Sequence, residues 1–557
     1  MTDAREYHER TNHTPESIRR STVTMDPANK PRPTKRYLDV DRIELDRIAP
    51  PWDPTLSLVA EARADPLAGT EQDRRTPIDA ETLATLCYAA TGITNEVEAD
   101  GQTMRFRAAS CTGKLYHVDC YLVCGDLPTL EAGIYHFDPA RFAFHVVCEG
   151  DFRGVLAGAA GDAVAGGTDS GDGATSGAGT SERTTRGADT RKSAAGDDTT
   201  PSTVAEAPVT VVATSTWWRN AWKYRERTYR HAFWDGGTIL ANLLAAAHGL
   251  DLRAQVVAGF VDDSVASVLG VDPKAEAPLA LVPIGGRPED SVAVGRKPST
   301  AVDPIDHDTA PLSSDPRDHP LIHEAWAAST LPDADSVTTW RTSARSLEDP
   351  GTADAGDGER IPLDPVDHET ASGRPLHPVV VRRGSARSFT DEGPSRRAVG
   401  TILDRATRGV PGDWNGGSAD GFDFLDAYVL ATGVDGVADG TYHYHPEEEA
   451  LERIGDVDRE TKTGLALNQQ WAGRAHLNVY LLANVDRVVD GLGNRGYRLA
   501  QLEAGIVLGR LYLATYAHRD LGGTGLTFYD GLVADHLAPR AGGQTPMTMF
   551  CFGRRAE

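Results

Sequence analysis

Apolar residues recur with two different periods along this chain, and each period predicts one kind of element. Where apolar residues return every three to four positions we predict helices, and where they alternate we predict strands. The elements follow one another as a helix, strands, a Gly-x-Tyr-His turn, a strand and a long helix. This order is found twice, with helices at 81–90, 231–249, 398–407 and 499–517 and strands at 115–123, 207–215, 424–433 and 475–485.

The two long helices, 231–249 and 499–517, are rich in alanine and leucine on most faces. We therefore expect each of them to be central and buried in its half of the molecule. The order of elements is not a regular alternation of strand and helix, so a parallel doubly wound sheet is not favoured. We predict an α+β fold with mixed or antiparallel sheets and flanking helices.

The two copies align with one another, which indicates a tandem duplication. The offset between equivalent residues is constant within each segment and changes between segments. The paired segments are 77–92 with 394–409 (offset 317), 133–139 with 440–446 (offset 307), and 227–269 with 495–537 (offset 268).

The fall in offset from 307 to 268 gives the first copy 39 additional residues. Residues 157–206, composed mainly of Gly, Ala, Ser, Thr and Asp, supply them and are predicted to be disordered. Within the polar stretch that follows the first copy, the segment HEAWAAS predicts a short helix. The expected organisation is a leader at 1–40, a first copy at 41–156 and 207–285 interrupted by the insert, a polar linker at 286–375, and a second copy at 376–557.

Charge adds a prediction about the environment. The formal net charge is −25, and only 8 of the 56 basic residues are lysine. An acidic surface with few lysines is typical of proteins that work in concentrated salt, where repulsion is screened, although an ordinary acidic protein is the alternative. Either way, nucleic acid is an unfavourable partner, because its phosphates repel an acidic surface.

The chain has no apolar run near the ~20 residues of a membrane span and no signal-peptide pattern at its N-terminus. None of its six cysteines forms a CxxC pair, and most lie in apolar, strand-like segments. We expect buried, reduced cysteines, no metal site, no membrane partner and a cytoplasmic location.

A first candidate site is the segment VRRGSARSF, residues 381–389. Arg383, Ser385 and Arg387 are spaced so that they can surround one phosphate with charge-assisted hydrogen bonds. Arg554 or Arg555 from the C-terminal CFGRRAE could join them. The alternative is a solvated basic stretch, which is less expected in so acidic a chain.

A second candidate is the turn in FRAASCTGKLYH, residues 106–117. Ser110, Thr112 and exposed amides could meet a planar polar ring, and Gly113 would let the backbone approach it closely. An ordinary turn would have the same composition. The segment GLGNRG at 491–496 matches a dinucleotide-binding pattern, but the first copy has no glycine there, so we interpret it as turn chemistry.

A third candidate is the pair Lys223 and Tyr224. A lysine partly withdrawn from water has a lowered pKa and can act as a base, and a tyrosine beside it can relay the proton. The alternative is a surface lysine next to a half-buried aromatic ring. The second copy has Gly491 and Leu492 at these positions.

Together these segments resemble the nitroreductase-like flavoprotein family, and within it the SagB-type (azoline) dehydrogenase branch. RRGSARSF is similar to the family's opening RRSxRxF, and both copies match the G-Y-Y-D/H-P turn and the ERGYR-helix-GGFDD run. The first copy lines up with the family's Pro-Ser-x-Gly turn, with Ser110 in place of proline, Cys111 in place of serine, and Gly113 retained. The resemblance covers about residues 7–285 and 376–554, without the inserts.

The resemblance implies a dimer-like fold with FMN in the interface, built here as an intrachain pseudo-dimer of two tandem nitroreductase-like domains. It implies that one half binds the phosphate and that the other contacts the ring. The implied cofactor-binding residues are Arg382, Arg383, Ser385, Arg387, Arg554, Ser110, Cys111, Thr112 and Gly113. Lys223 and Tyr224 are the implied catalytic pair, removing a proton while hydride passes to flavin N5.

Each copy lacks what the other retains. Asp65, Pro66, Ala68 and Thr70 stand where the second copy has its arginine-serine motif, and the second copy lacks the lysine and tyrosine. The turn does not separate the copies, because the second has GSADG with Ser418. We therefore expect one FMN per chain, with phosphate binding in the second copy and chemistry in the first.

The expected function is that of an FMN-dependent oxidoreductase, in which a flavin couples hydride transfer to proton removal. In the SagB-type branch the substrate would be a ring-bearing peptide made by a partner cyclodehydratase, with O2 as the acceptor. A broader nitroreductase would act on a small molecule with electrons from NAD(P)H. A flavin-free scaffold subunit of a peptide-maturation complex is the alternative from another class.

Overall fold

The computed structural model describes residues 2–21, 24–60, 77–99, 101–162, 204–285, 305–353, 356, 358–367, 373–416 and 423–556. Most of the predicted disordered insert and the beginning of the predicted linker lie outside these residues. So do Ser418 and residues 65–70, opposite the arginine-serine motif. None of the described helices combines the length and the apolarity that crossing a bilayer requires.

The first half contains a six-stranded antiparallel sheet. Its strand order is β1 (Arg42–Glu44), β6 (Ala143–Glu149), β5 (Gly133–Asp138), β4 (Val118–Cys124), β7 (Val209–Thr216) and β8 (Glu276–Ile284). Alternate residues of β4 belong to different cores, because Val118 and Leu122 pack toward the centre of the molecule and Tyr121 and Val123 toward its outside. The sheet is therefore covered on both faces.

Helices cover both faces of this sheet. The inner face packs on α4 (Ala80–Thr91) and α7 (Thr228–Gly249), and the outer face on α5 (Arg153–Ala159) and α8 (Asp262–Leu269). The predicted helices at 81–90 and 231–249 correspond to α4 and α7. A separate hairpin of β2 (Ile93–Ala99) and β3 (Gln102–Arg107) leads into the candidate turn.

The second half has a seven-stranded antiparallel sheet, with six strands in the same relative order. That order is β14 (Leu521–Gly525), β15 (Thr545–Arg554), β13 (Leu477–Ala483), β10 (Asp426–Ala431), β11 (Gly440–His445), β12 (Ala450–Gly455) and β9 (Arg360–Pro362). Its inner helices are α12 (Arg396–Thr407) and α15 (Val485–Ala517), and its outer helices are α13 (Arg459–Leu465), α14 (Gln470–Arg474) and α16 (Asp530–Leu537). The predicted α+β class with two antiparallel sheets flanked by helices is confirmed.

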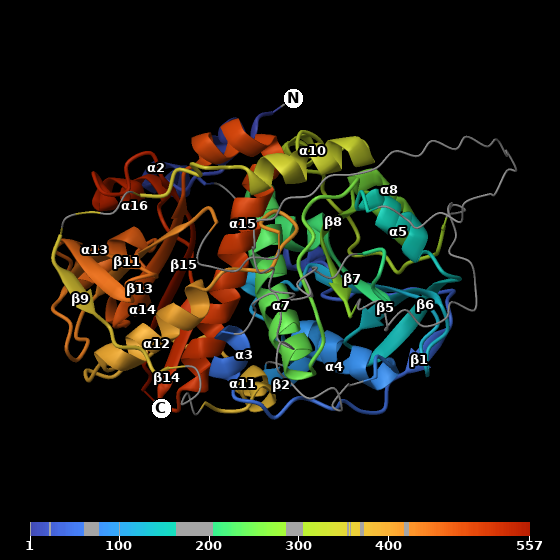
Figure 1. The fold of residues 1–557 in the computed structure, drawn as a ribbon, viewed down its shortest axis with the longest axis horizontal. Coiled ribbons are helices and arrows are strands. Elements are labelled where there is room, and N and C mark those ends of the chain that lie inside the picture. Colours follow the sequence, from blue (N-terminus) through green and yellow to red (C-terminus); the bar gives the residue numbers. More distant parts are fainter. Residues whose placement is uncertain are drawn as a thin grey trace, which may run out of the picture.

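The two halves meet along their central helices, α7 and α15, which lie side by side in the middle of the molecule (Figure 1). They cross at Gly237 and Gly505, residues that the sequence alignment had paired. A Cβ atom on Gly237 would lie 2.4 Å from the backbone of Gly505, and one on Gly505 would lie 2.5 Å from the carbonyl oxygen of Phe233. A residue that meets its own equivalent marks a two-fold axis, so the halves pack as a pseudo-dimer.

Two reciprocal ion-pair clusters join the halves on either side of this crossing. Arg227 and Arg230 of the first half bond Asp530 of the second, at 3.1 and 2.8 Å. Arg495 and Arg498 of the second half bond Asp262 of the first, each at 2.6 Å. All six side chains are at most 5 % exposed. The two guanidinium groups hold the pKa of Asp530 well below its usual range, against the effect of burial.

The leader supplies further acceptors to the first cluster. It begins with α1 (Ala4–Arg10) and α2 (Pro15–Arg20). The carbonyl oxygens of His8 and Thr11 accept from Arg230 and Arg227, and the His13 amide donates to Asp530 at 2.8 Å.

The predicted linker does the same for the second cluster. The carbonyl oxygens of Trp326 and Ser329 accept from Arg498 and Arg495, and the Leu331 amide donates to Asp262 at 3.1 Å. These residues follow or belong to α9 (Pro320–Ala327), which confirms the predicted short helix, and precede α10 (Ala334–Arg345). The segment from residue 320 is therefore a second leader, which the sequence analysis had interpreted only as a linker.

Two short helices bring the candidate phosphate motif to the seam. The two helices are α3 (Thr55–Ala60) and α11 (Leu376–Arg382), and backbone hydrogen bonds join their first residues. The Thr55 amide donates to the Arg374 carbonyl at 2.9 Å, and the Leu376 amide donates to the Asp53 carbonyl at 3.2 Å. Because α11 ends at Arg382, the residues that follow it lie against the first half.

Candidate functional site

The candidate turn of the first half is tied to the central helix by one carboxylate, that of Asp235 on α7. The amide of Thr112 donates to both carboxylate oxygens, at 3.0 and 2.9 Å, and its hydroxyl donates to Oδ1 at 2.7 Å. The thiol of Cys111 donates to Oδ2 at 3.1 Å. The side chains of Cys111 and Thr112 and the Thr112 amide therefore all face Asp235, which fixes the turn to α7.

The lysine and tyrosine of α6 (Trp217–Tyr224) lie against this turn. Gly113 has φ +63°, and a Cβ atom there would lie 2.8 Å from the Tyr224 hydroxyl oxygen. Lys223 Nζ lies over the Tyr224 ring, 5.0 Å from its centre. Two candidates that lie far apart in the sequence are thus brought together, and only glycine leaves room for the phenol.

Burial and charge shift both groups. The pKa of Lys223 is lowered because the side chain is partly withdrawn from water and because Lys30 and Arg387 are also positively charged. Burial raises the pKa of Tyr224, and the Asp235 carboxylate adds to the effect. Near neutral pH the tyrosine therefore remains a proton donor, while the lysine gives up its proton more readily than an exposed lysine does.

Arg383 crosses the seam to reach the same turn. Its guanidinium group donates to the carbonyl oxygens of Arg107, Ala108 and Ala109, at 2.6, 2.8 and 3.2 Å. These carbonyls directly precede Ser110. The second half thus contacts the turn of the first half, as the pseudo-dimer hypothesis requires.

Arg387 and Ser385 are exposed beside this contact. Arg387 lies over the Trp471 ring at 5.0 Å and forms no ion pair within the described residues. Lys223 likewise pairs with no carboxylate in the described part of the chain. Lys30, Lys223 and Arg387 form a group of cations without a paired carboxylate among the described residues. Such a group is unusual in a chain with a net charge of −25 and is suited to an anion.

Two predicted phosphate ligands have other partners. Arg382 donates to the carbonyl oxygens of His518 and Arg519, just beyond the C-terminal end of α15, at 3.0 and 2.9 Å. Arg554 forms an ion pair with Asp520 at 3.3 Å. Nε and Nη1 of Arg382 are nevertheless buried without a hydrogen-bond partner, and Arg383 donates to carbonyl oxygens just as Arg382 does. The predicted phosphate ligands Arg382, Arg383, Ser385, Arg387 and Arg554 therefore all stay predictions.

Sequence reasoning missed Asp235, His117 and Lys30. The His117 ring bonds Asp235 Oδ2 at 2.8 Å and the Ser215 hydroxyl at 2.8 Å. Cys111, His117 and Asp235 offer atoms close enough for a metal, but hydrogen bonds already connect all three. One signal could have identified Asp235, because the offset of 268 pairs it with another acid, Glu503.

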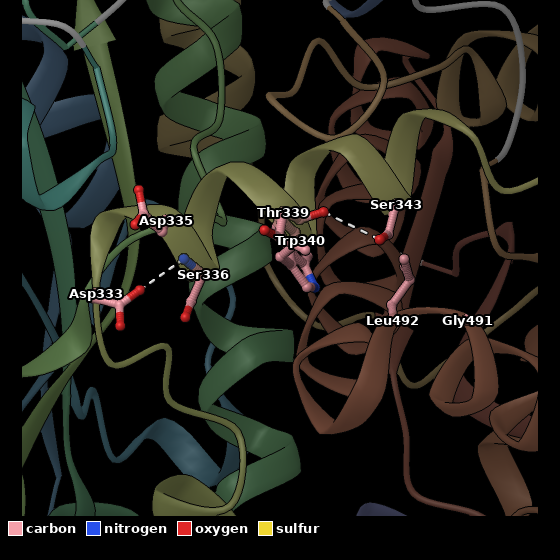
Figure 2. A pocket seen from close by; sticks show the side chains of 8 residues that line it. All are labelled: Asp333, Asp335, Ser336, Thr339, Trp340, Ser343, Gly491 and Leu492. Atoms are coloured by element: carbon pink, nitrogen blue, oxygen red, sulfur yellow. Dashed lines mark hydrogen bonds between the residues drawn. The ribbon is translucent and has the colours of Figure 1, made fainter.

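The corresponding place in the second half is different. Gly491 and Leu492, which replace the lysine and tyrosine, line a cavity of about 460 Å³ beneath α10 (Figure 2). Figure 2 shows Leu492 below Ser343 of α10, and the remaining lining residues are Asp333, Asp335, Ser336, Thr339 and Trp340. No cation is among the lining residues, so this cavity does not favour an anion.

Comparisons with known proteins agree with this fold. The protein named "Putative nitroreductase MJ1384" of Methanocaldococcus jannaschii is 28% identical over 192 residues, which are 33% of this chain and 92% of that protein. The crystal structure of a "putative nitroreductase" from Anabaena variabilis superposes with a TM-score of 0.70 at 21% identity and covers 100% of both chains, which shows a common fold. The E. coli microcin synthetase McbBCD complex with truncated pro-MccB17 bound matches at a TM-score of 0.26 and 17% identity over 51% of this chain and 91% of that one, too low a score to carry an argument.

The match to a family model is confined to one part of the chain. Residues 74–286 match the model described as the nitroreductase family, and this segment contains both the candidate turn and the Lys223–Tyr224 pair. This part of the chain is therefore similar to the nitroreductase family.

Proposed function

We propose that the protein is an FMN-dependent oxidoreductase with one complete flavin site on the seam between its halves. The observation that carries the proposal is the meeting of Arg383 of the second half with the turn that precedes Gly113 of the first half. The cofactor would supply a two-electron acceptor that couples hydride transfer to proton removal.

The residues present fit a phosphate-bearing flavin. Arg387 and Ser385 are exposed where a phosphate could reach them, and the cations around Lys223 have no paired carboxylate among the described residues. Arg383 holds the turn that would contact the ring. Gly113 lets the Tyr224 phenol pack against the turn, because a side chain there would collide with it.

Lys223 and Tyr224 would move the proton. With its lowered pKa, Lys223 can accept a proton from the substrate at Nζ, and the protonated Tyr224 hydroxyl can hold or relay one. The two groups are complementary because burial keeps the phenol protonated while it makes the amine easier to deprotonate.

The finer assignment is the SagB-type reaction, in which an azoline-bearing peptide made by a partner cyclodehydratase is oxidised. Only the sequence motifs support it, since the McbBCD likeness carries no argument. Turnover without added nicotinamide would favour this branch, and dependence on NAD(P)H would favour reduction of a small molecule by a broader nitroreductase.

Flavin content of the full chain, purified in high salt with added FMN, tests the proposal. We expect one tightly bound flavin per chain. Two flavins would contradict the single site, and a colourless protein that takes up no FMN would favour the flavin-free scaffold.

Replacement of the lysine tests its role. Lys223→Ala should still bind FMN but lose turnover by roughly 10²–10⁴-fold, the usual contribution of a general base. Lys274→Ala removes an exposed lysine elsewhere in the same half and serves as the matched control. Equal turnover of the two variants would remove Lys223 from the mechanism.

A further inference from the structure

The carboxylate of Asp235 has its full complement of hydrogen bonds. It accepts from the amide and hydroxyl of Thr112, from the Cys111 thiol, and from the His117 ring in its Nε2-protonated form. A carboxylate offers about four acceptor positions, so none is left for a ligand. Asp235 is 4 % exposed, and its contacts lie within the protein.

The turn needs such an anchor because its backbone is irregular. Gly113, Lys114 and Tyr116 all have positive φ, at 63°, 59° and 49°. Two of these three are not glycine, and a non-glycine residue in this region is held there only by its surroundings. Asp235 provides bonds to the middle of the turn from a helix that is itself fixed at the crossing of the halves.

A second tie comes from the same face of α7. The Thr238 hydroxyl, about one helical turn beyond Asp235, shares its proton between the Ser110 carbonyl and the Asp235 carbonyl of its own helix, each at 2.9 Å. The two ties hold the beginning and the middle of the turn, and the Ser215 hydroxyl holds the far nitrogen of the His117 ring at 2.8 Å.

The second half contains the matching acid but not the matching site. Glu503 on α15 accepts from the amides of Asp423 and Phe424, at 2.8 and 3.1 Å, just before β10. The position equivalent to Thr238 is Ile506, which has no hydroxyl. Both central helices thus anchor the segment before a strand, but among the residues that the structure describes the second tie and the Lys223–Tyr224 pair belong to the first half alone.

We infer that Asp235 is a positioning residue that determines flavin affinity by holding Ser110–Gly113, the turn proposed to contact the ring, in a single conformation. This inference rests on the proposed function. It also explains why the turn tolerates Cys111 in place of serine, because a thiol and a hydroxyl can both donate to Asp235.

The test compares Asp235→Asn with Glu503→Gln in the full chain, by FMN titration in high salt. Asparagine retains one acceptor for Thr112 but presents an amide nitrogen that cannot accept from Cys111 or His117. Loss of hydrogen bonds to a charged group should weaken FMN binding roughly tenfold to a hundredfold. Glu503→Gln, the acid-to-amide substitution at the equivalent position, should bind FMN within about twofold of the wild type.

Three results would overturn the inference. The first is wild-type FMN affinity in Asp235→Asn, and the second is equal weakening of FMN binding in Asp235→Asn and Glu503→Gln. The third applies if Asp235→Asn does not fold, and it is wild-type FMN affinity in Thr238→Val. That variant should bind FMN roughly threefold more weakly or worse, because one neutral hydrogen bond is removed. Wild-type protein that binds no FMN would instead refute the proposed function, and the inference with it. Faster hydrogen exchange at the Thr112 amide in Asp235→Asn, without a change at Phe424, would confirm that the turn itself has been loosened.

Discussion

The two halves of this protein have the same scaffold and different chemistry. Each has an antiparallel sheet with a common strand order, a central helix with an acid near its middle, and a buried Arg-Arg pair that bonds the other half. Only the first half has the Lys-Tyr pair, and only the second has the exposed arginine-serine motif. The shared features are those on which the packing of both halves depends.

There is a physical reason why the packing features are found in both halves and the candidate ligand-binding motifs in only one half each. Each ion-pair cluster contains residues of both halves, so losing either cluster would leave buried arginines without a partner. A ligand site on the seam also draws on both halves, but one complete site is enough for catalysis. The comparison therefore indicates that both copies had to keep the residues that stabilise their packing. Ligand binding required only one set of residues, drawn partly from each copy.

The largest expected effect comes from breaking one cluster. Asp530→Ala leaves Arg227 and Arg230 buried without an acid and should lower the free energy of unfolding by about 3–5 kcal/mol. Asp262→Ala should cost as much, since it leaves Arg495 and Arg498 in the same state. Chemical denaturation in high salt measures both.

Asp263→Ala is the control for this prediction, because Asp263 adjoins Asp262 and is exposed. If either cluster variant unfolds with the same free energy as this control, the clusters do not hold the halves together.

A smaller loss is expected at the crossing of the central helices. Gly237→Ala places a Cβ atom 2.4 Å from the Gly505 backbone and should destabilise the protein by about 1–3 kcal/mol. Gly158→Ala, in a helix with no heavy atom within 4 Å of the new Cβ, should instead be neutral or stabilising by up to about 1 kcal/mol. Thermal unfolding compares the two variants. If Gly237→Ala is as stable as the wild type, the central helices do not touch at Gly237.

The acid of the second half should make stability depend on pH. Burial raises the pKa of Glu503 from 4.5 to about 8, with the nearby Asp423 carboxylate adding to the effect. The folded state holds the Glu503 proton more tightly than the unfolded state does. The stability that Glu503 contributes is therefore complete below pH 4.5 and is lost as the pH rises from there through 8.

Wild-type protein should therefore lose about 1 kcal/mol between pH 6 and pH 7 relative to Glu503→Gln, which cannot titrate. Parallel unfolding titrations of the two proteins measure this difference. A constant difference across that range would show that Glu503 is already ionised.

The smallest effect is expected at the turn. Cys111→Ser keeps a donor for Asp235 and should change the free energy of unfolding by less than about 1 kcal/mol, with FMN affinity within about twofold of the wild type. Cys111→Val removes the donor and should weaken FMN binding more than Cys111→Ser does. Equal affinities in the two variants would show that the thiol hydrogen bond has no part in positioning the turn.

Much of the fold could be predicted because its signals are local. The period of apolar residues placed α4, α7 and the buried strands, and the constant offsets paired Arg227 with Arg495 and Gly237 with Gly505 before any contact was known. The second leader escaped this reasoning because it uses backbone groups. His8 and Trp326 supply the same carbonyl acceptor from unlike side chains, so the sequence shows no similarity there.

The candidate site was predictable only in part. Arg383 and Gly113 were expected to meet, and the structure brings Arg383 to the carbonyls just before that turn. Arg382 and Arg554 were predicted to bind phosphate as well, and the structure gives them protein partners that the sequence did not reveal, the carbonyl oxygens after α15 and Asp520. Neighbouring arginines have the same chemistry, and which of them faces a seam depends on where α11 ends and how the chain turns.

The sequence by itself determined the α+β class, the duplication and the division of motifs between the copies, because each is a pattern of neighbouring residues. Only the tertiary structure decided that Asp530 pairs with Arg227 and Arg230, and that Asp235 holds the turn. In a chain with 81 acidic and 56 basic residues, sequence offers too many possible partners for each charge. The packing of two central helices across a pseudo-two-fold axis selects among them, because it fixes which buried groups come within hydrogen-bonding distance.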